Sequence, residues 1–152
     1  MIEDCGPIVL LDTEHYLSEH FTKREMIKSN TGERLGIDNT PTPLIWERLS
    51  TTCISLLEPI RKLIQEKVGN YPITVNSGYR CPALNKAVGG SKTSQHMEGE
   101  AADIECFAMS TEQLYLLITK SKLEFDQCIH EKGWVHVSYS LRHKNKREAF
   151  RV

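Results

Sequence analysis

The chain has 152 residues, a length that favours one domain. Its 39% hydrophobic and 26% charged residues suffice for a packed core and exclude a disordered or fibrous chain. Nineteen basic and twenty acidic residues leave a net charge of −1, so nonspecific binding to nucleic acid has little electrostatic support. The sequence holds no apolar run of the roughly 20 residues that a membrane span needs.

The N-terminal segment, residues 1–19, has weak periodicity and is expected to form an irregular arm. Its apolar run at 8–11 follows two acidic residues, Glu3 and Asp4, instead of a basic stretch. A secretory signal is therefore not expected.

Five cysteines are spread along the chain without a C-x-x-C pair. This pattern disfavours a zinc knuckle or a disulfide scaffold and predicts reduced, mostly buried thiols. They are Cys5, Cys53, Cys81, Cys106 and Cys128.

A capping-box pattern marks the first helix, because Thr22 is followed three residues later by Glu25. We expect a helix of about two turns that ends near residues 29–30. Residues 30–41 are rich in Asn, Thr, Gly and Pro and are expected to form a connecting loop.

A long helix is expected next, starting with Thr42 as its N-cap and Pro43 in its first turn. Apolar residues then recur at spacings of three and four as far as Ile64, which is typical of one buried helix face. Pro59 lies inside this pattern and predicts a kink or a break. Gly69 marks the end.

The hydrophobic period then changes from near 3.6 to 2. This change predicts strands over 73–76, 101–106, 125–129 and 134–139, the last two joined by a turn at Lys132-Gly133. Short helices are expected over 82–88 and after the capping box at Ser110.

Helices that precede an antiparallel sheet define an α+β fold, with N-terminal helices packed on a small sheet. We assign one domain to residues 20–141. The tail at 142–152 is basic and is expected to be solvated.

Two histidines and one aspartate carry the most informative spacing. His96 and Asp103 lie seven residues apart, so they converge only if Gly99 turns the chain into the strand that holds Asp103. His136 lies two residues after Trp134, so the two side chains share one face of the last predicted strand. Two imidazoles, one carboxylate and an open position match the ligand set of a catalytic zinc site. On spacing alone, an alternative without a metal explains the same residues: a capped turn around His96 and a hydrogen-bonded histidine in the sheet.

Three motifs occur in order: SGYR at 77–80, SxHxxGxAxD at 94–103 and WVHVS at 134–138. Together they resemble the signature of the zinc D-alanyl-D-alanine carboxypeptidase family, which includes L-alanyl-D-glutamate endopeptidases and shares its fold with the hedgehog signalling domain. The resemblance is close to the phage and prophage members and covers about residues 20–140. It implies a hedgehog/DD-peptidase-like fold.

The resemblance implies that His96, Asp103 and His136 bind one zinc ion per chain. It also implies that Arg80 binds substrate, a role that suits a planar guanidinium facing a carboxylate. The alternative for Arg80 is a surface salt bridge. Ser94 and Trp134 are expected to border the substrate, with Ser94 also fixing its loop.

The general base is a separate question, since several family members carry the acid three residues before the last histidine ligand, where this chain has Gly133. If the hairpin loop has two residues, Glu131 pairs with Trp134 and shares the face of His136. Asp126 then falls on the opposite face. Glu131 is therefore the expected general base, and a slip of one residue in the register would favour Asp126 instead.

We therefore expect a zinc peptidase that cleaves peptide bonds of the peptidoglycan stem peptide, as a D-Ala-D-Ala carboxypeptidase or an L-Ala-D-Glu endopeptidase. The alternative is a zinc-containing binding domain of the same fold without turnover. The expected partner is the peptidoglycan peptide, with no nucleic acid, no membrane span and a monomeric state. The chain is expected to be made in the cytoplasm without a signal peptide and to act on the cell wall if released.

Overall fold

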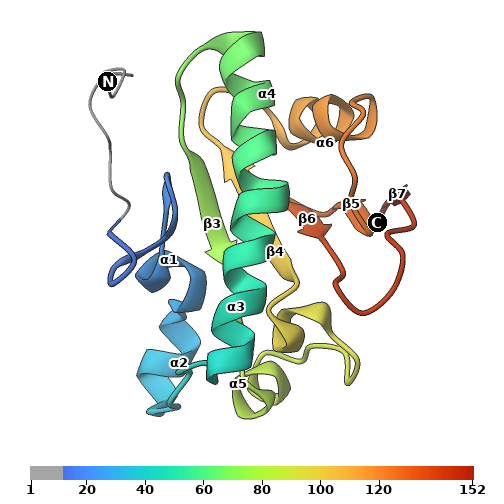
Figure 1. Cartoon of the computed structure of the whole chain (residues 1–152). Coiled ribbons are helices and arrows are strands. Elements are labelled where there is room, and N and C mark those ends of the chain that lie inside the picture. Colours follow the sequence, from blue (N-terminus) through green and yellow to red (C-terminus); the bar gives the residue numbers. More distant parts are fainter. Residues whose placement is uncertain (1–11) are drawn as a thin grey trace, which may run out of the picture.

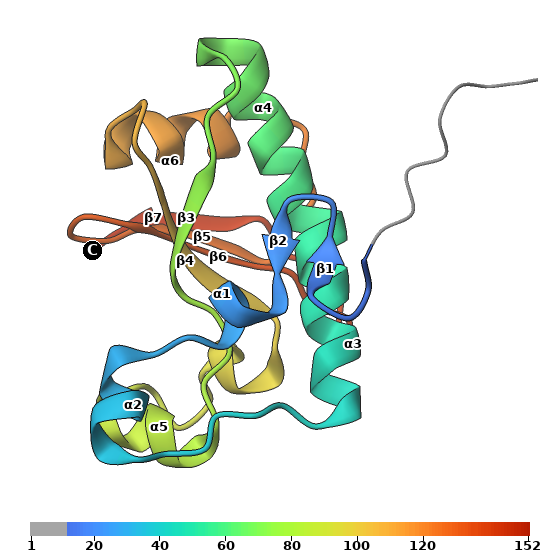
Figure 2. The same ribbon diagram turned by 90° about the vertical axis from the view of Figure 1, so that its left-hand side faces the viewer.

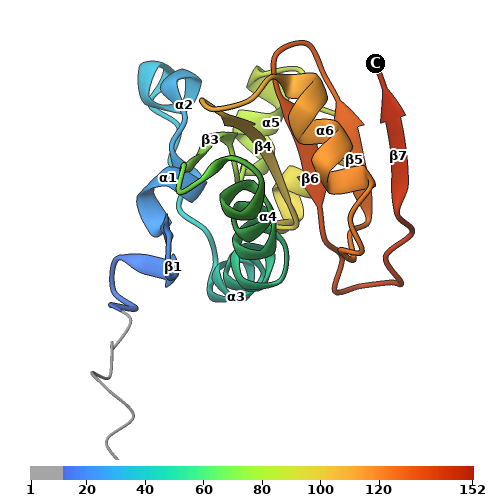
Figure 3. The same ribbon diagram turned by 90° about the horizontal axis from the view of Figure 1, so that it is seen from above.

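The computed structural model describes residues 12–152. The predictions for Cys5 and for the apolar run at 8–11 lie outside these residues. A long helical rod crosses one face of a five-stranded sheet, and helix α6 (Thr111–Thr119) packs beside it on the same face (Figures 1 and 3). The predicted α+β class, with helices packed on a small sheet, is confirmed. Within residues 12–152, no helix is long and apolar enough to cross a membrane.

The first helix begins as predicted but is shorter. Thr22 caps α1 (Lys23–Ile27), and the reciprocal bonds with Glu25 complete the capping box. The expected loop over 30–41 is wrong in its first half, since residues Asn30–Leu35 form α2. Ser29 caps α2 by accepting a hydrogen bond from a backbone N–H, and Gly36 ends it in the left-handed conformation.

The long rod consists of α3 (Pro43–Thr52), a π-helical turn η1 (Cys53–Leu57) and α4 (Glu58–Val68). The predicted irregularity at Pro59 is therefore a π-turn, in which the N–H of Glu58 donates to the carbonyl of Cys53 five residues back. The wider turn accommodates a residue that has no N–H and whose ring crowds the preceding turn. The helix continues without a break.

The apolar face of the rod supplies much of the core. Its fully buried side chains are Leu49, Cys53, Leu56, Leu57, Ile60 and Ile64. They pack in one cluster with Ile104, Val135 and Val137 from the sheet.

The sheet has the strand order β3-β4-β6-β5-β7, and its first four strands are antiparallel as predicted. These strands are β3 (Ile73–Ser77), β4 (Ala101–Cys106), β5 (Gln127–His130) and β6 (Val135–Ser138). The short helix α5 (Pro82–Ala87) and the 3₁₀ turn η2 (Gln95–Glu98) lie in the polar stretch between β3 and β4.

Two strands add to the sequence-based description. β1 (Tyr16–Ser18) pairs with β2 (Phe21–Thr22) and lies in the segment expected to be irregular. β7 (Glu148–Arg151) pairs in parallel with β5, so the basic tail extends the sheet while its side chains remain exposed.

Arginine side chains anchor this tail. Arg147 donates to the carbonyl of Thr119, the last residue of α6, and to those of Ser121 and Leu123 just beyond it. Its guanidinium lies 4.5 Å from the ring centroid of Phe125. A cation at a helix C-terminus satisfies carbonyls that have no partner within the helix. These contacts hold the tail at the edge of the sheet.

All four described cysteines are free, and Cys53, Cys106 and Cys128 are buried. Burial raises the pKa of the Cys128 thiol to about 12. These three thiols are packing groups, in line with the predicted mostly buried, reduced cysteines, while the half-buried Cys81 caps α5 by accepting the N–H of Leu84.

Candidate functional site

Three side chains predicted from distant segments meet at one point. Oδ1 of Asp103 lies 3.2 Å from Nε2 of His96 and 3.0 Å from Nδ1 of His136. The two imidazole centroids are 5.1 Å apart. Four-coordinate zinc with bonds of about 2.0–2.1 Å separates its donor atoms by roughly 3.3 Å, so both measured separations suit a shared ion.

The backbone explains this convergence. Gly99 follows η2 with a φ of +70° and turns the chain into β4, as its place between His96 and Asp103 predicts. Asp103 then pairs directly with His136 across β4 and β6. One turn and one register position therefore bring three donors together from two sequence segments.

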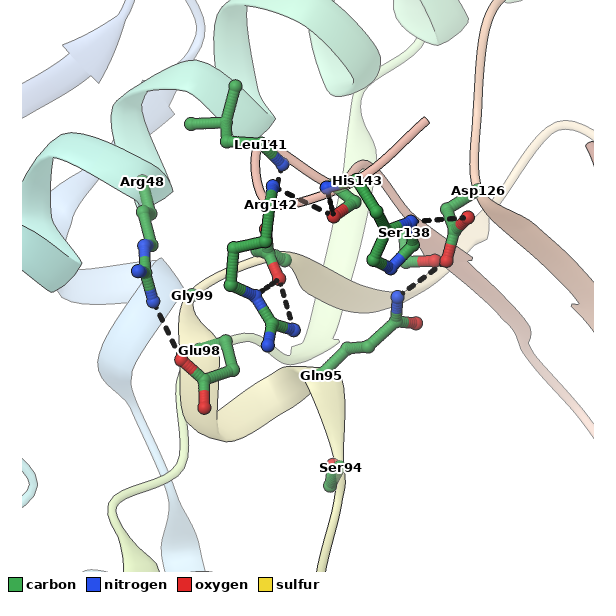
Figure 4. A network of polar contacts seen from close by, with 12 residues as sticks. Arg48, Ser94, Gln95, Glu98, Gly99, Asp126, Ser138, Leu141, Arg142 and His143 are labelled. Carbon is green, nitrogen blue, oxygen red and sulfur yellow. Dashed lines mark hydrogen bonds and ion pairs between the residues drawn. The ribbon is translucent and has the colours of Figure 1, made fainter. Parts of the chain in front are cut away.

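Charged contacts on both sides fix that turn (Figure 4). Arg48 on α3 binds Glu98 at 2.6 Å, and Arg142 binds the fully buried Glu100 at 2.7 Å. A buried carboxylate left without its partner is costly, so the pair of Arg142 with Glu100 holds the segment after Gly99 in one conformation. The partly exposed pair of Arg48 with Glu98 adds a contact before Gly99.

His96 has a defined hydrogen-bonding role. Its Nδ1 lies 2.7 Å from the carbonyl oxygen of Gly78, which can only accept, so Nδ1 carries the proton. In a neutral ring, Nε2 then presents a lone pair to the carboxylate of Asp103. Two acceptors at 3.2 Å need a cation or a proton between them. The donor set therefore fits a metal ion, with the carbonyl of Gly78 orienting the histidine.

Burial by itself would raise the pKa of Asp103, but the close contacts with His136 and His96 outweigh it. The pKa of this carboxyl lies well below its usual value, so Asp103 is an anion at neutral pH. An ionised carboxylate with two histidine nitrogens is a donor set that zinc accepts.

His96, Asp103 and His136 line a cleft of about 520 Å³. Alternate side chains from β5, β6 and the hairpin turn between them face this cleft. They are Gln127, Ile129, Glu131, Trp134 and His136.

The hairpin has the register that places Glu131 on this face. Ile129 pairs with His136, and the N–H of Glu131 donates to the carbonyl of Trp134 at 2.9 Å across a loop of Lys132 and Gly133. The predicted two-residue loop is confirmed.

Asp126 has a different environment. It is 4% exposed, and its carboxylate accepts a hydrogen bond from Nε2 of Gln95 at 2.8 Å (Figure 4). The N–H of Lys146 donates to the same carboxylate at 3.2 Å. It does not line the cleft. Of the two acids considered from the sequence, Glu131 is the one that lines the cleft together with His96, Asp103 and His136.

Arg80 also lines the cleft. Its guanidinium donates to Oγ of Ser94 at 3.4 Å, and within residues 12–152 it forms no ion pair. Its Nε is buried without a hydrogen-bond partner. Burial lowers the pKa of Arg80, and the nearby Asp103 carboxylate partly offsets this effect. The alternative of a surface salt bridge has no partner in the described chain.

Ser94 and Trp134 border the same cleft. Oγ of Ser94 accepts the N–H of His96 at 3.2 Å and so caps the turn that carries this histidine. The expected loop-fixing bond of Ser94 is therefore present.

Sequence reasoning missed Asn39, which fixes the segment that carries Arg80. Its Nδ2 donates to the carbonyls of Ile27 and Tyr79, and its Oδ1 accepts the N–H of Cys81 at 2.7 Å. The bonds to Tyr79 and Cys81 join residues about 40 positions apart in sequence, so no local pattern predicts them.

Comparison with known proteins agrees with this geometry. The Peptidase M15 family matches residues 19–138, which include all three donors and the cleft. The chain belongs to this family. A segment of 41 residues is also 46% identical to the zinc D-Ala-D-Ala carboxypeptidase of Streptomyces albus G. That segment covers 27% of this M15 chain and only 16% of the Streptomyces enzyme.

Proposed function

We propose that the chain is a zinc-dependent peptidase that hydrolyses peptide bonds in the stem peptide of peptidoglycan. The observation that carries this proposal is the cluster of His96, Asp103 and His136 beside a cleft that also presents one acid and one arginine. Family membership and the partial similarity to a zinc D-Ala-D-Ala carboxypeptidase support it.

His96, Asp103 and His136 would hold one zinc ion. Zinc at such a site lowers the pKa of a water molecule and polarises the scissile carbonyl. Nδ1 of His96 keeps its proton on the carbonyl of Gly78, which leaves Nε2 as the donor atom.

Glu131 would act as the general base and acid. From the end of β5 its carboxylate shares the cleft with His136, so it can accept a proton from the attacking water. The same group then delivers the proton to the leaving amine.

Arg80 would bind a carboxylate or the carbonyl oxygen of the substrate. A guanidinium that is partly desolvated and has no protein anion as partner gains a charge-assisted, two-point contact when such a group arrives. Trp134 and Ser94 border the same space, where Trp134 covers apolar substrate surface and limits access of bulk water.

The second candidate is a zinc-containing binding domain of the same fold. The position three residues before His136 is Gly133, so the acid found there in several family members is absent. The presence of Glu131 in the cleft favours the peptidase.

Digestion of purified peptidoglycan, with mass analysis of the soluble products, tests the proposal. We expect stem-peptide fragments or free D-Ala with the zinc-loaded protein, and none after a chelator has removed the metal. Restoration by added zinc is the control. Tight binding to the polymer without any released product would support the binding domain instead.

A further inference from the structure

A second hollow adjoins the cleft on the far side of Arg80. It has a volume of about 440 Å³, and Arg80 and Val88 line both spaces. Its remaining walls come from the junction of α1 and α2 and from β3, which lie side by side (Figure 2). The groove therefore continues beyond the residue assigned to substrate binding.

The second hollow is cationic and polar. Its only charged side chains are Lys28 and Arg80, and no carboxylate lines it. Within residues 12–152, neither Lys28 nor Arg80 forms an ion pair. Glu105 lies nearby and accepts a hydrogen bond from Asn76 at 2.7 Å, but it is not part of the wall.

Further polar atoms in this hollow have no protein partner. In the described part of the chain, no side-chain hydrogen bond is made by Asn30, Thr31 or Ser77. Polar side chains without protein partners leave donors and acceptors available to a bound peptide.

β3 forms one edge of the sheet and supplies Val75, Asn76 and Ser77 to this wall. Within residues 12–152, no backbone hydrogen bond joins β3 itself to α1. The N–H of Tyr79 donates to the carbonyl of Met26, but Tyr79 lies beyond the end of the strand. An unpaired strand edge can accept an extended peptide as an additional strand.

We propose that the hollow around Lys28 is a subsite for an acidic residue of the substrate, so that the peptide runs past Arg80 along the edge of β3. This inference rests on the proposed function and deepens it. The substrate is then a peptide with a free carboxylate outside the scissile dipeptide, and the enzyme cleaves within a chain that continues on the Arg80 side.

The test uses two stem peptides that differ only in the acidic residue outside the scissile bond, which is a free carboxylate in one and a carboxamide in the other. We expect Lys28→Glu to raise KM for the carboxylate peptide about three- to tenfold with kcat unchanged, and to leave the carboxamide peptide within twofold. Lys67→Glu, a change of equal charge at an exposed position of α4, is the control and should not discriminate between the peptides.

Equilibrium binding to Glu131→Gln, with and without Lys28→Glu, gives a readout without turnover. Loss of preference for the carboxylate on changing Lys28 supports the subsite even if no peptide is cleaved, in which case only the proposed function fails. Cleavage by the wild type with equal effects of Lys28→Glu on both peptides, or with no effect, overturns the subsite and leaves the peptidase standing.

Discussion

Gly78 is a position where one added carbon disturbs both the fold and the metal site. An ideal Cβ built on Gly78 lies 2.3 Å from the carbonyl oxygen of Met26, and real Cβ atoms essentially never approach closer than 3.0 Å. The obstacle is backbone, so no side-chain rotation relieves it. The N–H of Tyr79 donates to the same oxygen at 2.7 Å, and Gly78→Ala must strain this bond.

The expected cost is about 2–3 kcal/mol, near the upper part of the range for overpacking because the neighbour is rigid. For a chain of this size, the melting temperature should fall by about 4–12 °C. The carbonyl of Gly78 also orients His96, so the zinc affinity should fall by about tenfold or more.

Thermal unfolding by circular dichroism and competition with a chromophoric chelator measure these two effects. Gly32→Ala is the matched control, because a Cβ there meets its neighbours at 3.4 Å or more and lies within a helix. This control should be neutral or slightly stabilising. An unchanged melting temperature and zinc affinity in Gly78→Ala would refute the packing argument.

Three further predictions concern Arg80, Glu58 and Arg147. Arg80→Lys should keep zinc content and melting temperature but lower kcat/KM by an amount equivalent to about 2–4 kcal/mol, because an ammonium keeps the charge and loses the two-point geometry. Steady-state kinetics close to those of the wild type would contradict a role of Arg80 in substrate binding. Burial alone would raise the pKa of Glu58, but the nearby Ser18 hydroxyl and the contacts with the backbone N–H and ring of His20 outweigh it and hold this pKa below 4.5. The contribution of Glu58 to stability is therefore present above pH 4.5 and is lost as pH falls through the folded-state pKa. Below pH 4.5, the free energy of unfolding measured by denaturant titration should therefore fall less steeply with pH in Glu58→Gln than in the wild type. The same pH dependence in both proteins would contradict this. Arg147→Ala should cost about 1 kcal/mol of stability, because the contacts with backbone carbonyls are lost, and should lower the melting temperature by about 2–4 °C. An unchanged melting temperature would show that these exposed bonds contribute nothing.

The sequence predicts the parts of this structure that depend on local chemistry. The capping boxes at Thr22 and Ser110 form as the side-chain spacing requires. The turn at Gly99 and the two-residue hairpin loop also follow from local backbone preferences. These local features suffice to bring His96, Asp103 and His136 together, once the strands pair.

Other features depend on contacts between distant segments and have no local pattern. β7 is exposed on every residue and lacks alternation, so it forms because β5 has a free edge and Arg147 and Arg151 anchor the tail. The bonds of Asn39 to Tyr79 and Cys81, the two neighbours of Arg80 in sequence, also join distant segments. α2 is not predicted because its segment has a composition typical of loops, although Ser29 and Gly36 mark the two ends of the helix.

The most direct test of the central claim measures zinc content and turnover on the same preparations of wild type, His136→Ala, Glu131→Gln and Asp126→Asn. We expect about one zinc per chain in the wild type and loss of both zinc and activity in His136→Ala. Glu131→Gln should retain zinc and lose turnover by about 10²–10⁴-fold, while Asp126→Asn changes turnover much less. Full zinc occupancy in His136→Ala, or normal turnover in Glu131→Gln, would contradict the account of a zinc peptidase with Glu131 as its base.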